Sequence, residues 1–526
     1  MLTLTLACLL LDLPSQSSSL LSAVPDDATA VAVCSDVGLL HDRIANNRWA
    51  QFLQTSTGKG LLIDSLLEGV GTSEFDKMAE IGSELRGESV FFSRGTMTGF
   101  LTIPPTSPGT LKAAMQNWMP DKAQGYNHAS QVMFGAQVDI LARDRSELYQ
   151  GVLARSAPAV ALVHHPKAFG LFTADNGEDL LSGLKSSLSG LGSAHHSPLV
   201  EALMAHRSEV GHAGLVELIV DSSEAINEMV DDFSPPGVKL TRELVLGEGS
   251  SHLYLSLDAQ PGTRLEMRGL FSVPAGTLAS RFADCLRPLP TGLADSIPHD
   301  SIALTSIGLD IAKGYDLGRT LLEELNAEEA MNTVEQGLAA GEAMTGVDLE
   351  QAMIRQLIGP FTAVLLDTHE GAASGELFDL PAFFSYGLRS GAQFQEALEE
   401  LMPLGEQFIQ LELTDVEGVD VYQTEGFEMG LAFLPQAFIL GMNESTLTNA
   451  ISLAIGKIPV TGEPGRVSDT LMANPGVCAL ATTVMSPFWH SMMELDDKAL
   501  ELMEGAQLTS TMRRVTAGFE LRLIAH

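Results

Sequence analysis

Two patterns of hydrophobic and polar positions recur along the chain, in the same order in both halves. Short alternating segments rich in Val, Ile, Leu and Phe predict β-strands, and apolar residues spaced three and four apart predict α-helices. The predicted strands are residues 28–33, 88–92 and 100–103 in the first half and residues 302–307, 360–366 and 380–384 in the second. The predicted helices are residues 39–53, 110–119, 317–325 and 392–402. Pro120 and Pro403 are expected to end the second helix of each half.

Further along the second half, the pattern predicts a hairpin followed by a helix. The hairpin comprises residues 419–422 and 430–440, and Ser445 is the expected N-cap of a helix that continues to Leu453. Strands joined by both hairpins and helices are typical of α+β folds. We therefore expect two similar tandem α+β domains, each a mainly antiparallel sheet with helices packed on one face.

Four short sequence motifs occur twice, in the same order. Residues 24–31 (Val-Pro-Asp-Asp-Ala-Thr-Ala-Val) are echoed by residues 297–304 (Ile-Pro-His-Asp-Ser-Ile-Ala-Leu). The other pairs are residues 166–169 with 435–438, residues 203–205 with 471–473, and residues 265–268 with 519–522. The distance within a pair shortens gradually along the chain, as small loop deletions would cause. Collinear echoes of this kind predict an internal duplication.

Length and composition agree with two domains. The 526 residues exceed what one hydrophobic core usually serves. The predicted division is a leader over residues 1–20, a first α+β repeat over residues 24–290 and a second over residues 297–526. With 45% hydrophobic and 18% charged residues, the chain can bury substantial cores and does not have the composition of a disordered protein.

The chain is strongly acidic. Its 30 Lys and Arg against 67 Asp and Glu give a net charge of −37, which is spread along the sequence. Such a charge repels phosphate backbones and anionic lipid surfaces, so a nucleic-acid-binding protein is excluded. Divalent cations or saline surroundings would suit the charge, although no motif supports cation binding. A solvated acidic surface that maintains solubility explains the same observation.

The first residues resemble an export signal. Residues 1–13 are an apolar run too short to span a bilayer, and Pro14 and a Ser-rich stretch follow. The run contains Asp12 and has no Lys or Arg near its start, so a short buried helix or an upstream start codon is the alternative. The context of Cys8 matches a lipid-attachment motif only weakly. The later apolar runs are too short to form a membrane-spanning helix, so the mature chain is expected to have no transmembrane helix.

Metal-ligand and nucleophile motifs are weak in this sequence. The densest histidine region has neither the spacing nor the neighbouring acids of a metal site, and it comprises His164, His165, His195, His196, His206 and His212. Ser-x-x-Lys occurs at residues 56–59 and 182–185 without the other motifs of penicillin-recognising enzymes. Adjacent Asp pairs at residues 26–27, 231–232 and 496–497 lack the alternating spacing of a calcium loop. No catalytic, cofactor-binding or metal-binding residue is therefore predicted.

The isolated cysteines give no disulfide framework or zinc motif. Cys34, Cys285 and Cys478 lie far apart in apolar or mixed contexts, where cysteine usually serves as a small core residue. One disulfide bond remains the alternative.

Several of these features together resemble a family of exported bacterial proteins known only as a domain of unknown function. The resemblance rests on the short leader, the opening motif of residues 24–31, the spacer of residues 344–350 (Met-Thr-Gly-Val-Asp-Leu-Glu) and the strand of residues 418–422 (Gly-Val-Asp-Val-Tyr). It covers nearly the whole chain. It implies a secreted or cell-envelope protein without an assigned activity, and it implies no site residues.

The sequence thus favours a non-catalytic, exported protein in the periplasm, at the cell surface or outside the cell. A binding or structural role through a groove between the two repeats is expected, with an unknown envelope or extracellular partner. The alternative is a hydrolase with an active site in one repeat only. An enzyme would require a buried carboxylate, His or Lys with a strongly shifted pKa in a cleft.

Overall fold

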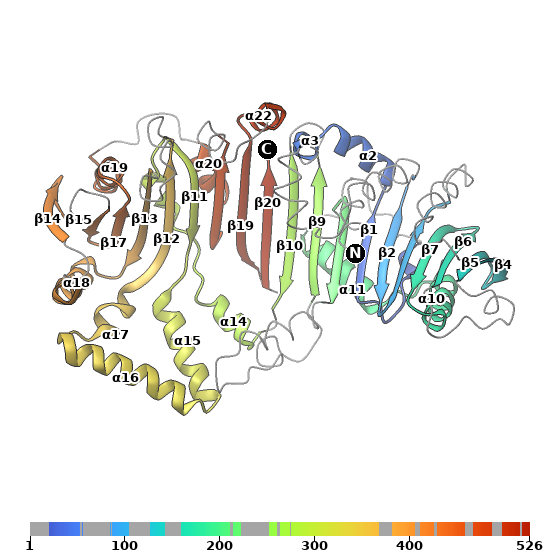
Figure 1. Cartoon of the computed structure of the whole chain (residues 1–526), viewed down its shortest axis with the longest axis horizontal. Coiled ribbons are helices and arrows are strands. Elements are labelled where there is room, and N and C mark those ends of the chain that lie inside the picture. The colour runs from blue at the N-terminus through green and yellow to red at the C-terminus, as the bar shows by residue number, and fades with distance from the viewer. Residues whose placement is uncertain are drawn as a thin grey trace. The chain divides into compact units, whose positions relative to one another are not determined.

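The computed structural model describes residues 20–52, 55, 85, 87–104, 127–142, 159–210, 214–221, 252–259, 264–273, 275–367, 381–405, 411–424, 429–457, 466–485, 497–515 and 518–526 (Figure 1). These residues form two compact units, one up to Phe271 and one from Ser272 onward. The predicted first repeat, residues 24–290, extends past this division. The predicted leader lies outside the described residues except for Leu20, which is buried.

The ten strands described in the first unit form an antiparallel sheet. Their spatial order is β4 (Asn127–Met133), β5 (Ala136–Ala142), β6 (Ala159–His165), β7 (Ala168–Ala174), β3 (Met97–Thr102), β2 (Ser89–Arg94), β1 (Ala30–Cys34), β8 (Val216–Asp221), β9 (His252–Ala259) and β10 (Leu265–Ser272). The helices are η1 (Leu21–Ala23), α2 (Val37–Ala45), α3 (Arg48–Phe52), α10 (Gly177–Gly190) and α11 (Pro198–Val210).

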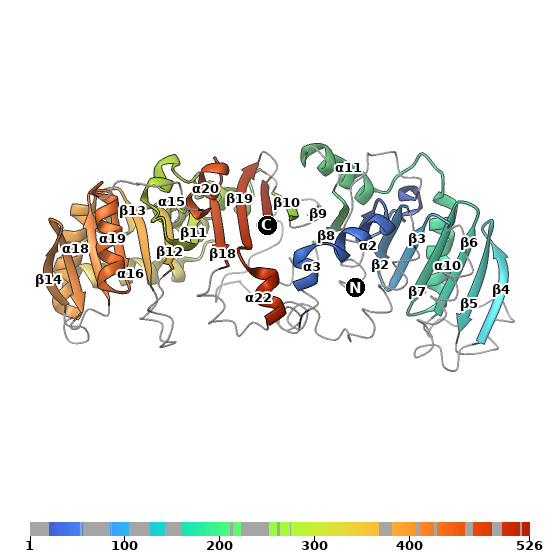
Figure 2. The same cartoon turned by 90° about the horizontal axis from the view of Figure 1, so that it is seen from above.

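Helices cover both faces of this sheet, so the predicted one-sided arrangement is wrong. All five residues of β1 are buried, which requires cover on both sides. On one face, Val37 of α2 joins the core cluster that contains Ala32 and Cys34. On the other face, Gly183 of α10 lies directly over Met97, where a Cβ atom would overlap the sulfur. Figure 2 shows α11 and the α2–α3 segment on different sides of β8.

The ten strands described in the second unit also form an antiparallel sheet. Their order is β14 (Leu411–Val416), β15 (Val419–Thr424), β16 (Gly430–Leu434), β17 (Ala437–Gly441), β13 (Ala382–Leu388), β12 (Leu357–Leu366), β11 (Ser301–Ile307), β18 (Ala479–Val484), β19 (Gln507–Val515) and β20 (Gly518–Ala525). Numbered within each unit, this is the same strand order as in the first unit.

The helices of the second unit also lie on both faces of its sheet. They are α14 (Leu278–Ala283), η3 (Thr291–Ser296), α15 (Ile311–Glu324), α16 (Glu328–Thr345), α17 (Leu349–Ala352), η4 (Ile354–Gln356), α18 (Gly391–Gly405), α19 (Glu444–Ala454), α20 (Arg466–Ala473) and α22 (Asp497–Met503). Leu447 of α19 and Leu471 of α20 pack in one core cluster with Leu304, whereas Phe394 of α18 packs in another with Tyr422. Mixed helices and antiparallel sheet confirm the α+β prediction.

Each predicted strand overlaps an observed strand, but several helix boundaries differ. The helix predicted over residues 39–53 is divided into α2 and α3, because the Asn47 side chain accepts the Trp49 N–H and begins a new helix. The helix α18 continues through Pro403 to Gly405, so the predicted stop at that proline is wrong. The helix predicted over residues 110–119 lies outside the described residues.

The N-cap of α19 is Asn443, and the prediction of Ser445 is wrong. Asn443 has an extended backbone, and its side chain accepts the N–H of Thr446 at 2.9 Å. Ser445 is already the second helical residue, and its hydroxyl hydrogen-bonds to the Asn443 side chain. Asn and Ser are about equally good N-caps, so residue preference alone did not decide between them.

The four pairs of sequence echoes fall on corresponding elements of the two sheets. Residues 24–31 and 297–304 lead into β1 and β11, and residues 166–169 and 435–438 form the β6–β7 and β16–β17 turns. Residues 203–205 and 471–473 lie in α11 and α20, and residues 265–268 and 519–522 lie in β10 and β20.

Candidate interaction surface

The histidines singled out in the sequence are dispersed. His164 lies 3.7 Å from the carboxylate of Asp139, and its ring contacts Phe169 edge-on. His195 pairs with Asp26 at 2.9 Å, with both side chains 70% exposed. His206 is a buried residue of α11, and His212 lies outside the described residues. In the described part of the chain, no three His, Cys, Asp or Glu side chains come together as a metal-binding group.

The other candidate motifs, where they fall on described residues, make hydrogen bonds or are buried in the core. Ser182 of α10, the serine of the second Ser-x-x-Lys motif, is exposed and accepts a hydrogen bond from Arg94 at 3.0 Å. Residues 56–59, 231–232 and 496 lie outside the described residues. Cys34, Cys285 and Cys478 are all buried, as the core-residue interpretation predicts. Burial raises the pKa of the Cys285 and Cys478 thiols.

A polar cluster is buried between α11 and the sheet of the first unit. The Glu217 carboxylate on β8 accepts two hydrogen bonds from Arg207 Nε, at 2.8 and 2.7 Å, and one from the Tyr254 hydroxyl at 2.8 Å. The His206 ring lies 5.6 Å from the Tyr254 ring. Glu217 is only 2% exposed and Tyr254 is fully buried. Burial and the adjacent Glu217 charge raise the pKa of Tyr254 far above its usual value.

The register shows that the second unit lacks this cluster. In the first unit Glu217 lies opposite Val33 of β1, and in the second unit Leu480 lies opposite Ser306 of β11. Tyr254 of β9 lies opposite Ile219, two residues after Glu217. Thr509 of β19 lies opposite Thr482, two residues after Leu480, so Thr509 corresponds to Tyr254. An apolar residue therefore fills the corresponding position in the second sheet.

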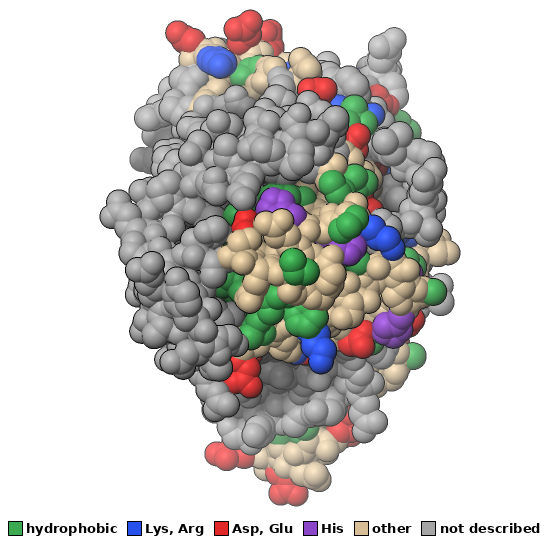
Figure 3. Space-filling view, turned by 90° about the vertical axis from the view of Figure 1, so that its right-hand side faces the viewer, with side chains coloured by type: hydrophobic (Ala, Val, Ile, Leu, Met, Phe, Trp, Pro, Cys, Tyr) green, Lys and Arg blue, Asp and Glu red, His purple; other side chains and the backbone are tan. Residues whose placement is uncertain are grey.

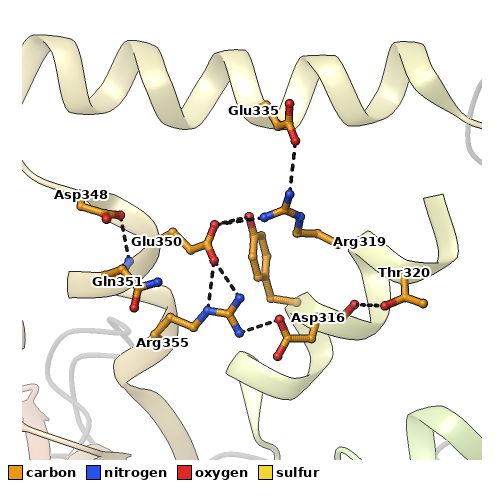
Figure 4. Close-up of polar contacts among 9 residues, drawn as sticks. Asp316, Arg319, Thr320, Glu335, Asp348, Glu350, Gln351 and Arg355 are labelled. Atoms are coloured by element: carbon orange, nitrogen blue, oxygen red, sulfur yellow. Dashed lines mark hydrogen bonds and ion pairs between the residues drawn. The ribbon is translucent and has the colours of Figure 1, made fainter. Parts of the chain in front are cut away.

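A second polar cluster connects the helices α15, α16 and α17, which lie beyond one end of β11 and β12 (Figure 1). Glu350 accepts hydrogen bonds from Tyr315 at 3.1 Å, from Arg319 at 3.4 Å and from Arg355 at 2.7 Å (Figure 4). The Tyr315 ring contacts both guanidinium groups, with centroid distances of 6.0 and 5.3 Å.

The same two arginines extend this cluster to other helices. Arg319 reaches Glu335 of α16 at 3.2 Å, and Arg355 reaches Asp316 of α15 at 2.5 Å. Each charged group thus has an opposite charge beside it, and the contacts join α15, α16, α17 and η4. The arrangement is that of a structural connection between these helices.

Charge is distributed very differently in the corresponding parts of the two units. Residues 390–456, which include α18, β14–β17 and α19, contain eleven Asp and Glu and no Lys or Arg. The corresponding residues 103–190 of the first unit contain seven of each sign. The description of the charge as spread along the sequence therefore misses one long segment of a single sign, and counting Lys and Arg in windows would have found it.

In the first unit, the outermost described strand of the corresponding segment is β4, which pairs with β5. Figure 3 shows Lys, Arg, Asp, Glu and His side chains among hydrophobic ones on one face of the described residues. Val132 on β4 is 82% exposed, and Phe134 at the β4–β5 turn is 40% exposed.

The outermost strand of the acidic segment is β14. Among the described residues it pairs only with β15, and Leu411 and Leu413 on it are 39% and 60% exposed. Its turn to β15 consists of Glu417 and Gly418, both with positive φ, which is the two-residue type I′ hairpin. Lys457 Nζ hydrogen-bonds the Glu417 carbonyl oxygen at 2.9 Å and holds this turn.

Behind β14 the sheet is closed by α18. Gln395 donates to the Tyr422 hydroxyl at 3.2 Å, and that hydroxyl donates to the Glu399 carboxylate. Burial raises the pKa of Tyr422, and the bond to Glu399 adds to the shift. The remaining carboxylates near the edge, Glu412, Asp415 and Asp420, are exposed. Within the described part of the chain, the edge therefore presents unpaired strand backbone, two leucines and several carboxylates.

Comparisons with known proteins assign no family. No family model matches the chain, and a search of curated proteins finds no match. A solved structure described as "Structure of crystal form I of TP0453" is similar over 50% of this chain and 81% of its own, with 13% identity and a TM-score of 0.26. A score of this size supports no inference about fold or function. Within the described residues, no helix has the length and apolar character needed to cross a membrane.

Proposed function

We propose that the protein is a non-catalytic, exported or cell-envelope protein made of two copies of one α+β domain, and that it binds a cationic partner at the acidic end of the second copy. Export rests on the leader pattern of residues 1–20. The observation that carries the binding role is the difference in charge between residues 390–456 and residues 103–190, which occupy the same part of the strand order.

Duplication is supported by details beyond the shared strand order. Ala28 donates to the Pro25 carbonyl at 3.1 Å, and at the corresponding turn Ser301 donates to the Pro298 carbonyl at 3.2 Å. Gly87 and Gly359 lie two residues before Ser89 and Phe361, which pair with the ends of β1 and β11, and have φ of 78° and 75°. Such positions favour glycine, and two unrelated domains would have no reason to share them.

Binding is favoured over hydrolysis because the buried carboxylate of Glu217 is paired within the protein, whereas the carboxylates at the β14 edge are exposed. The Glu217 cluster is the group that a hydrolase in one copy would offer, since its carboxylate is buried and the second copy lacks it. Its carboxylate is occupied by Arg207 and Tyr254, and with Tyr254 fully buried the cluster has no face for a substrate. The carboxylates of Glu412, Asp415 and Asp420 at the β14 edge, in contrast, are exposed, and of these Asp415 also accepts the Gly418 N–H at 3.2 Å.

A charge-neutralised variant tests the binding role. In Glu412→Gln/Asp415→Asn/Asp420→Asn, we expect a fluorescent deca-lysine peptide to bind about five- to tenfold more weakly at low salt, from a few tenths of a kcal/mol per exposed charge. The matched control is Glu328→Gln/Glu329→Gln/Glu342→Gln on α16, which removes the same net charge from another exposed segment. Fluorescence anisotropy gives both affinities. Equal weakening by both variants would mean that the peptide responds to net charge alone, and would contradict the proposal.

A further inference from the structure

The hairpin geometry determines which backbone groups of β14 face outward. In a two-residue hairpin the residues that flank the turn, here Val416 and Val419, exchange hydrogen bonds, and alternate residues along the strand do the same. The N–H and C=O groups of Glu412, Thr414 and Val416 therefore point to β15. Those of Leu411, Leu413 and Asp415 point away from it, along the open edge.

The side chains of β14 divide between the two faces of the sheet. Leu411 and Leu413 share a face with Tyr422 of β15, since Leu413 and Tyr422 are paired in the register. Glu412 lies on the opposite face. A strand added at this edge would thus place alternate side chains beside two exposed leucines and beside a carboxylate.

We propose that this edge of β14 receives an extended segment of a partner protein, in which apolar and cationic residues alternate, by β-strand addition. The proposal rests on the proposed function and specifies how the partner is held. Backbone hydrogen bonds to Leu411, Leu413 and Asp415 would supply affinity, and the side-chain pattern would supply selectivity. Exposed edges with apolar side chains are the sites where such pairing occurs.

Charge identifies the occupant as a cationic partner in preference to a second copy of this chain. A second β14 would bring another segment with eleven carboxylates and no Lys or Arg against the first. The β4 edge of a second copy, residues 127–133, has no Lys or Arg to pair with Glu412 or Asp415. A segment with Lys or Arg at alternate positions satisfies the Glu412 carboxylate and the open backbone, and its apolar positions then lie beside Leu411 and Leu413.

The test compares two substitutions at one position in the full chain. Leu413→Ala removes the exposed side chain and keeps the outward N–H, whereas Leu413→Pro also removes that N–H, which β15 does not use. The probe is a fluorescent ten-residue peptide of alternating Val and Lys. We expect Leu413→Pro to bind it about tenfold more weakly than Leu413→Ala, which corresponds to one lost hydrogen bond with some distortion of the strand.

Amide hydrogen exchange of the unmodified protein gives a readout that does not depend on how the variants fold. On addition of the peptide, the amides of Leu411, Leu413 and Asp415 should become protected, whereas those of Glu412 and Thr414, already paired with β15, should change little.

Three other outcomes would overturn the inference, and each identifies which part of it is wrong. If both Leu413 variants bind equally and no alternate protection occurs, strand addition is wrong, while weaker binding by the charge-neutralised variant would still support the proposed function. If the unmodified protein binds neither basic peptide, the proposed function fails as well. If sedimentation shows that the protein alone self-associates and that Leu413→Pro abolishes this, the occupant is a second copy.

Discussion

Replacement of Arg207 by Met is expected to destabilise the first unit by about 3–5 kcal/mol, because it leaves the Glu217 carboxylate buried without its counter-ion. Glu217 is 2% exposed, so solvent cannot replace the lost guanidinium. The Tyr254 hydroxyl still donates one hydrogen bond, but a neutral donor does not compensate a full charge. Urea unfolding followed by circular dichroism, analysed as separate transitions for the two units, measures the loss.

The second unit indicates how this stability can be recovered. Leu480 occupies the position that corresponds to Glu217, so an apolar residue is compatible with this sheet. We expect the triple variant Arg207→Met/Glu217→Leu/Tyr254→Phe to recover stability to within about 1.5 kcal/mol of the original, because no buried charge is left without a counter-ion. A triple variant as unstable as Arg207→Met alone would show that the polar groups themselves are needed for packing.

Replacement of Glu350 by Ala is expected to cost about 2–3 kcal/mol in the second unit and to loosen the helices α15–α17. One carboxylate accepts from Tyr315, Arg319 and Arg355, so its removal affects all three contacts together. The side chain is 20% exposed, and solvent screening keeps the cost below that of the Glu217 cluster.

The control for Glu350→Ala is Glu342→Ala on exposed α16, which should change stability by less than about 0.5 kcal/mol. Thermal unfolding gives the stability, and amide exchange shows whether α16 opens. We expect faster exchange in α16 for Glu350→Ala, although the Arg319–Glu335 pair still connects α15 to α16. Equal effects of the two substitutions would contradict a connecting role for Glu350.

The fold class could be predicted from the local spacing of hydrophobic and polar residues, because this spacing reflects which side of a strand or helix is buried. β1 and β11 alternate or are wholly apolar, and both lie in the interior of their sheets. The cover on both sheet faces could not be predicted, because periodicity shows that a helix has an apolar side and not which face it meets. The α19 cap shows a similar limit, since Asn443 and Ser445 have nearly equal preferences and the end of β17 decides between them.

The polar clusters could not be derived from spacing, because their members are distant in sequence. Arg207 and Tyr254 meet at Glu217 only through the pairing of β8 with β9 and the packing of α11. The acidic end of the second unit, in contrast, is visible in the sequence as residues 390–456 without Lys or Arg. Its relation to an open strand edge needed the register of β14.

A reversal of charge at the β14 edge tests the central claim most directly. The measurement is the affinity of Glu412→Lys/Asp415→Lys/Asp420→Lys, and of the unmodified protein, for alternating Val-Lys and Val-Glu peptides. The account predicts that the unmodified protein prefers the Val-Lys peptide and that the reversed variant prefers the Val-Glu peptide. An unchanged preference for the Val-Lys peptide in the reversed variant would contradict binding at this edge.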